Sequence, residues 1–172
     1  PQAPSTARCM NYLGLDPGKH GAVVVLSPDG GVLDWWRTPL AAKDYDGPAM
    51  QRIARASAVM SNAGLRAFLE APAVYGLYSS LAYTVGFGFG RWMHALESEQ
   101  VSIGRIVPAS VWTAMFLPAK RKGMSKKDRK AHLVAQARRL QPEKIPWDTL
   151  NQQARSGVAD ALLIAEWGRR KG

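Results

Sequence analysis

Apolar runs near the start of the chain predict an antiparallel sheet. Residues 11–26 hold two such runs, and Pro17 and Gly18 between them are typical of a tight turn. The second run contains three consecutive valines, which favour a strand. Residues 27–31 combine proline, aspartate and two glycines, as hairpin connections do, and a third apolar run follows at 32–38. We therefore expect a meander of three antiparallel strands.

Two further strands alternate with helices in the rest of the chain. Residues 65–72 and 101–108 are short apolar runs that each end at a proline, which cannot donate to a strand ladder. A loop is expected at 39–48 and a proline-containing connector at 141–153. Apolar positions at helical spacing, together with capping residues, predict helices at 48–63, up to about residue 99, at 109–116, at 125–140 and at 156–168.

The composition is that of a soluble globular protein, with 172 residues of which 47% are hydrophobic and 21% charged. We expect one domain over residues 11–172, preceded by a flexible tail at 1–10. The single cysteine, Cys9, leaves no disulfide framework within the chain and no cysteine-based zinc site. No apolar run reaches the ~18 residues of a membrane helix, and the first residues lack the apolar core of a signal peptide. We expect no membrane partner.

The charge balance changes the picture. Lysine and arginine number 23 against 13 acids, a net charge of +10, which favours a polyanionic partner and nucleic acid ahead of a membrane surface. Nine of the basic residues lie between residues 120 and 139, where only Asp128 opposes them. Such a run is commonly a solvated face. In an already basic chain, contact with phosphates is the better interpretation.

Three acids stand in apolar surroundings. Asp16 ends the first strand, Glu70 lies at the C-terminal end of the fourth, and Asp160 lies among apolar residues of the last helix. A buried carboxylate is costly unless something pairs with it, and a divalent metal is one such partner. Since sites in open α/β sheets lie outside the carboxyl ends of strands, neighbouring strands could bring Glu70 close to Asp16.

Each acid also has a simpler explanation. Asp16 could cap its own turn, because Asp-Pro-Gly is mostly turn chemistry. Glu70 could be solvated in an edge turn. Asp160 could complement the positive end of its helix macrodipole.

Aromatic residues and glycines alternate over residues 73–90. The aromatic residues are Tyr75, Tyr78, Tyr83, Phe87 and Phe89. Near a basic surface they could stack on bases, and the glycines could let the backbone approach a phosphate. The alternative is a glycine-rich helix start that packs closely on the sheet.

Four short motifs follow one another along residues 11–168. They are Gly-Leu-Asp-Pro-Gly at 14–18, Phe-Leu-Glu-Ala-Pro at 68–72, Gly-Phe-Gly-Phe-Gly-Arg-Trp at 86–92 with Ile-Val-Pro-Ala-Ser-Val-Trp at 106–112, and Ala-Asp-Ala-Leu-Leu-Ile-Ala at 159–165. In this order and spacing they resemble the ribonuclease H-like nucleases, specifically the Holliday-junction resolvases of the RuvC type. The third motif, which combines residues 86–92 and 106–112, looks like that of the phage and plant-organelle branch of this family. The resemblance implies an α/β fold in which two parallel strands extend the three-strand meander into a five-stranded mixed sheet flanked by helices.

The resemblance also implies an activity. It is that of a metal-dependent endonuclease that resolves four-way DNA junctions by paired symmetric nicks, through two-metal phosphodiester hydrolysis. Asp16, Glu70 and Asp160 would bind Mg²⁺, for which Mn²⁺ would substitute, with Asp16 bridging. Lys126 or Lys127 would stabilise charge on the scissile phosphate. The protein would act as a homodimer, in the cytoplasm or nucleoid of a phage or bacterial system or in an organelle nucleoid.

Eleven basic and aromatic residues are expected to contact DNA under this resemblance. They are Lys19, Tyr75, Tyr78, Phe87, Phe89, Arg91, Lys120, Arg121, Lys122, Arg129 and Lys130.

One position departs from the family. RuvC-type proteins commonly have another acid or a histidine three residues before the helix acid, and here that position is Gly157. Either three carboxylates suffice, or Asp148, Ser156 or a water completes the metal shell. The three histidines suggest no ligand set.

Other functions compete with this one. A phosphate-handling ATPase of the actin and sugar-kinase type also begins with a Gly-x-Asp-x-Gly turn. Such a protein needs two such domains, and a length of 172 residues with no second glycine-rich phosphate loop argues against it. A non-catalytic DNA-binding module could keep the fold, although all three acids are present. A nuclease acting on forks, flaps or RNA–DNA hybrids would keep the chemistry and change the substrate.

Overall fold

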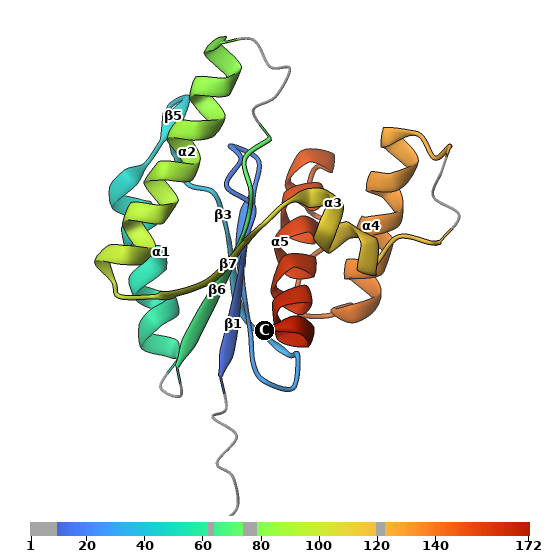
Figure 1. The fold of residues 1–172 in the computed structure, drawn as a ribbon, viewed down its shortest axis with the longest axis horizontal. Helices are drawn as coiled ribbons and strands as arrows, with labels where there is room; N and C mark the ends of the chain where they lie inside the picture. Colours follow the sequence, from blue (N-terminus) through green and yellow to red (C-terminus); the bar gives the residue numbers. More distant parts are fainter. Residues whose placement is uncertain (1–9, 62–63, 74–78, 120–122) are drawn as a thin grey trace, which may run out of the picture.

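Five strands pair into one mixed sheet in the order β3-β2-β1-β6-β7 (Figure 1). The computed structural model describes residues 10–61, 64–73, 79–119 and 123–172. The strands of this sheet are β1 (Asn11–Leu15), β2 (Ala22–Leu26), β3 (Val32–Arg37), β6 (Leu65–Glu70) and β7 (Ser102–Val107). The first three are antiparallel neighbours, and β6 and β7 continue the sheet in parallel with β1. The five-stranded mixed sheet expected from the sequence is therefore confirmed.

The register of β1 against β6 decides where two of the acids lie. Gly14 pairs with Phe68 and Leu15 with Leu69. The next residue on each strand is an acid, Asp16 after β1 and Glu70 as the last residue of β6. Parallel strands end at the same edge of a sheet, so both carboxyl groups leave the sheet there side by side.

Helices cover both faces of the sheet. Helices α1 (Gly47–Met60) and α2 (Ser79–Ser98) lie on one face, while α5 (Gln152–Lys171) lies on the other with α4 (Lys126–Leu140) outside it (Figure 1). Strand β2 serves both cores, since Val23 and Val25 pack toward α1 and α2 and Val24 packs toward α5. Burial on both faces explains why β2 is a continuous apolar run. A short helix α3 (Ala109–Trp112) and a 3₁₀ turn (Thr113–Met115) follow β7.

Helix α5 lies very close to β1. A Cβ atom built on Gly14 would stand 2.1 Å from the carbonyl oxygen of Ala161 and 2.8 Å from the Cβ of Ala165. Only glycine permits this approach. The helix is buried through most of its length, as expected of an element packed between the sheet and α4.

Several boundaries differ from the sequence prediction. Helix α5 begins at Gln152 because Asn151 caps it, its side chain accepting a hydrogen bond from Ala154 N at 2.9 Å. The expected loop at 39–48 contains a small hairpin of β4 (Leu40–Ala41) and β5 (Asp44–Tyr45). Helix α1 ends at Met60. The Ser125 cap of α4 is confirmed, since its hydroxyl accepts from Asp128 N at 3.1 Å.

No helix in the described ranges is both long and apolar enough to cross a membrane.

The contact between β1 and α5 predicts a stability difference between two glycine substitutions. Gly14→Ala should lower the free energy of unfolding by about 1–3 kcal/mol, because the added methyl group has no room against backbone atoms. Gly86→Ala, within α2, meets nothing within 4 Å and should be neutral or stabilising, since alanine is the better helix former. Urea unfolding of both variants checks this, and equal effects would contradict the close contact.

Candidate active site

Three carboxyl groups from three elements interact at the edge of the sheet where β1 and β6 end. Asp16 directly follows β1, Glu70 is the last residue of β6, and Asp160 comes from α5. Asp16 and Asp160 line one cleft of about 270 Å³, together with Lys130 and Ser156. The charge of Asp16 raises the pKa of both other acids, and Glu70 further raises that of Asp160. The three therefore form one electrostatic group.

Burial is the main cause of the raised pKa values. It raises the pKa of Asp16 above its ordinary value and that of Asp160 well above it. Burial and the neighbouring charge of Asp16 together raise the pKa of Glu70 to about 7. Each residue keeps a part of its surface open to solvent. Such perturbed carboxyl groups in a cleft mark a functional site.

Two hydrogen bonds hold the acids at the strand ends. Gly18 N donates to Asp16 Oδ1 at 3.0 Å, so Asp16 does cap its turn while also facing the cleft. Trp112 Nε1 donates to Glu70 Oε2 at 2.9 Å, and the indole is buried. Both bonds favour the ionised carboxylate and fix its orientation. Glu70 is therefore not a solvated edge residue.

Asp160 lies too far along α5 to act as a macrodipole acid. The helix begins at Gln152, about two turns earlier, and the dipole effect fades within the first turn. The simpler explanation of Asp160 is thus wrong. Its neighbours Ala159 and Ala161 are fully buried, and Asp160 itself faces the cleft.

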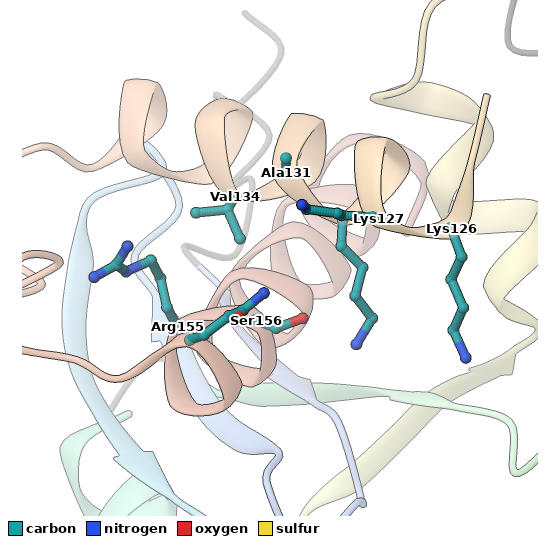
Figure 2. Close-up of a pocket in the computed structure, with 8 residues that line it drawn as sticks. Lys126, Lys127, Ala131, Val134, Arg155 and Ser156 are labelled. Atoms are coloured by element: carbon teal, nitrogen blue, oxygen red, sulfur yellow. The ribbon is translucent and has the colours of Figure 1, made fainter.

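Lys130 on α4 is the cation that acts on the whole group. Its positive charge lowers the pKa of Asp16, Glu70 and Asp160, and it lines the same cleft. His20, at the turn after β1, lines the cleft as well and lowers the pKa of Asp16. Lys126 and Lys127 line an adjoining cavity that also includes Lys130 (Figure 2).

The donor set suits a hard cation. Carboxylate oxygens are the ligands that Mg²⁺ prefers, and a bound cation would stabilise the ionised carboxylates and so oppose the burial that raises these pKa values. As the side chains stand, no three acids, histidines or cysteines among the described residues are close enough to form a finished metal-ligand cluster. Asp16, Glu70 and Asp160 would hold the ion by turning their carboxyl groups toward it.

Packing explains the glycine at position 157. A Cβ atom there would stand 1.9 Å from the carbonyl oxygen of His20 and 2.8 Å from Gly21 Cα. Helix α5 thus lies against the turn that carries Asp16, and no side chain fits between them. Ser156 lines the cleft. Asp148 instead accepts two hydrogen bonds of 2.8 Å from Arg138 on the exposed surface.

Three glycines of the glycine-rich segment, Gly86, Gly88 and Gly90, lie within α2. Gly88 packs against Tyr45, whose ring atoms would stand 2.2 Å from an added Cβ, while Gly86 and Gly90 meet nothing within 4 Å. Among these three glycines, the packing explanation therefore holds for Gly88 only. Tyr83, which is 70% exposed, stacks on Phe87 with ring centroids 5.8 Å apart.

The residues expected to contact DNA lie in several places. Arg91 stands over the Phe87 ring at 4.8 Å, and Lys19, Tyr83 and Phe87 line a depression beside β5. Phe89 packs against the core under α1 and α2. Arg129 is exposed on α4. Tyr75, Tyr78, Lys120, Arg121 and Lys122 lie outside the described residues.

Trp112, His20 and Gly157 contribute to the site in ways that the sequence pattern did not predict. A buried tryptophan needs a partner for its N–H, which is a signal that a polar group lies nearby, but spacing alone does not name Glu70. The packing of Gly157 against a turn distant in sequence leaves no local signal at all.

Comparisons with known proteins bear on the fold. No protein-family model matches the chain, and no curated protein matches it significantly. The solved structure "Thermus thermophilus RuvC structure" superposes with a TM-score of 0.61 at 16% identity, covering 94% of this chain and 96% of that one. "T. thermophilus RuvC in complex with Holliday junction substrate" gives a TM-score of 0.60 at 16% identity, covering 94% and 95%. The chain therefore has the RuvC-type, ribonuclease H-like fold, and its expected place in the phage and plant-organelle branch stays a prediction.

The raised pKa of Glu70 predicts a pH-dependent stability. In the folded state the Glu70 carboxyl has a pKa of about 7, whereas its ordinary pKa, which applies in the unfolded state, is 4.5. Between these pH values the folded state therefore binds more protons than the unfolded state. The free energy of unfolding of metal-free protein should therefore fall as pH rises through this range, by on the order of 1–3 kcal/mol. Glu70→Gln should flatten the fall.

Urea unfolding in chelator over this pH range measures the effect. Glu97→Gln on the exposed face of α2 is the matched control and should keep the wild-type profile. A wild-type profile that rises with pH, or one that Glu70→Gln leaves unchanged, would contradict the assigned burial.

Proposed function

We propose that this chain is a divalent-metal-dependent endonuclease that resolves four-way DNA junctions. The observation that carries the proposal is the group formed by Asp16, Glu70 and Asp160. Burial raises the pKa of all three carboxyl groups, the charge of Asp16 further raises that of the other two, and the positive charge of Lys130 acts on all of them. The RuvC-type fold supports the same conclusion, as does the likeness to a structure whose title names a Holliday junction substrate.

The three carboxylates would hold Mg²⁺, with Mn²⁺ as a substitute. Bound at this site, such ions supply an activated water and stabilise the leaving oxygen of a phosphodiester. The chain's own contribution is positioning. Gly18 N holds Asp16, the Trp112 indole holds Glu70, and the close packing of α5 holds Asp160 toward the same cleft.

Lysines on α4 would neutralise the scissile phosphate. Lys130 already acts electrostatically on all three carboxyl groups, and its ammonium group is well placed to offset negative charge that develops on a phosphate in the cleft. Lys126 and Lys127, which line the adjoining cavity, are proposed for the same role on this or the next phosphate.

The substrate is proposed to be junction DNA and the active form a homodimer. The net charge of +10 favours phosphate backbones, but phosphate contacts carry no sequence information. A four-way junction has approximate two-fold symmetry, so a two-fold symmetric dimer would place two sites on opposed strands and produce paired nicks.

Cleavage of matched substrates tests this function. A synthetic four-way junction is compared with linear duplex, fork, flap and RNA–DNA hybrid of the same sequence, with Mg²⁺ and with chelator. Symmetric, Mg²⁺-dependent nicks confined to the junction are expected. Binding without cutting would indicate a non-catalytic module. Preference for another substrate would support a nuclease but contradict the four-way junction as its substrate.

Asp16→Asn should separate catalysis from binding. Loss of this ligand should slow junction cleavage by more than about 100-fold, since even groups that only orient metal ligands cost 10–100-fold. Junction affinity in chelator should stay within a few-fold, because the basic surface is intact. Asp34→Asn on β3, two strands away, is the control. Equal cleavage by both variants would remove Asp16 from the active site.

A further inference from the structure

A cavity of about 800 Å³ lies between the first turns of α4 and α5 (Figure 2). It adjoins the carboxylate cleft, because Lys130 and Ser156 line both. Both helices begin at the edge of the sheet where β1 and β6 end (Figure 1). The volume falls in the range of about 300–1,000 Å³ that is typical of small-molecule sites.

The rim of this cavity is cationic. Lys126, Lys127, Lys130 and Arg155 line it, and no acid does. Within the described part of the chain, none of the four forms an ion pair. Arg155 Nη2 donates to Leu150 O at 2.8 Å, but its buried Nε has no partner among the described residues. The four positive charges give the cavity a positive potential, which favours an anionic ligand.

Part of the lining is apolar. Ala131 and Val134 lie on α4 between the lysines and Arg155 (Figure 2). Inorganic phosphate would leave this surface uncovered. A ligand that carries both a phosphate and a flat, weakly polar body suits it, and a nucleotide has both parts.

We infer that this cavity receives one nucleotide of the DNA strand next to the scissile phosphate, with its phosphate toward the lysines and its base against Ala131 and Val134. The inference rests on the proposed function, because it assumes that a DNA strand passes through the carboxylate cleft. A strand that leaves the carboxylate cleft past Lys130 enters the cavity directly, since the two share that residue. Extruding a base costs least where it is already poorly stacked, as at a branch point.

Fluorescence of 2-aminopurine tests the inference. Four-way junctions that carry the analogue at one nucleotide at a time around the branch point are bound to the protein in chelator, so that no strand is cut. Fluorescence should rise several-fold at one position on each of two opposed strands, because the base leaves the stack there. Ala131→Phe, which fills the cavity, should abolish the rise.

Matched variants separate this from general effects. Ala131 and Ala135 are both exposed on α4, but only Ala131 lines the cavity, so Ala135→Phe should keep the rise. Arg155→Gln should weaken junction binding several-fold more than Arg139→Gln, which alters an exposed arginine of the same charge outside the cavity. An equal rise in Ala131→Phe and Ala135→Phe would overturn the inference.

Two further arms identify what else could occupy the cavity. Calorimetric titration with deoxyadenosine monophosphate should show no binding tighter than millimolar. Suppose that the mononucleotide binds at micromolar concentration, that Ala131→Phe removes this binding, and that junction binding causes no rise in 2-aminopurine fluorescence. The cavity would then be assigned to a free nucleotide, and the inference that a DNA strand enters it would be overturned. Junction cleavage in Mg²⁺ is followed in parallel. Protein that cuts no DNA but keeps the position-specific rise would overturn the proposed function and support the nucleotide site.

Discussion

The burial of three interacting carboxyl groups at one edge of the sheet is the constraint on which this structure depends. Asp16 and Glu70 are adjacent because β1 and β6 pair in register and end together, and Asp160 is added from the other layer by α5. A fold that collects these charges in a buried place loses stability unless a cation offsets them. Lys130 and the hydrogen bonds from Gly18 and Trp112 offset the charge in part. A divalent ion and a phosphate would complete the balance.

Glycine makes this collection of charges possible. Gly14 lets α5 lie on β1, and Gly157 lets the same helix lie on the turn after Asp16. The second contact occupies the position at which the resemblance led us to expect a further ligand, so the close approach of α5 takes the place of that side chain. The remaining polar groups of the cleft then come from Ser156 and His20. Structure and site thus share one determinant, the depth at which α5 packs.

Much of the fold could be predicted from residue pattern, because strands and helices leave local periodic signals. Asp16, Glu70 and Asp160 could also be predicted as site residues, because an acidic side chain is unusual among apolar neighbours. The early start of α5 could not be predicted, because the cap at Asn151 precedes four residues without an apolar stripe. The bond from Trp112 to Glu70 joins residues far apart in the chain, and the space between helices α4 and α5 depends on how two helices pack. Such tertiary features have no sequence period.

Direct measurement of metal binding tests the central claim that the three carboxyl groups act as one cation site. Mn²⁺ is titrated into the free protein near pH 8 and followed by electron paramagnetic resonance, with wild type compared with Asp160→Asn. The account predicts saturable binding to wild type that the substitution abolishes or weakens at least tenfold. Equal binding by the two proteins, or none by wild type at millimolar Mn²⁺, would contradict it.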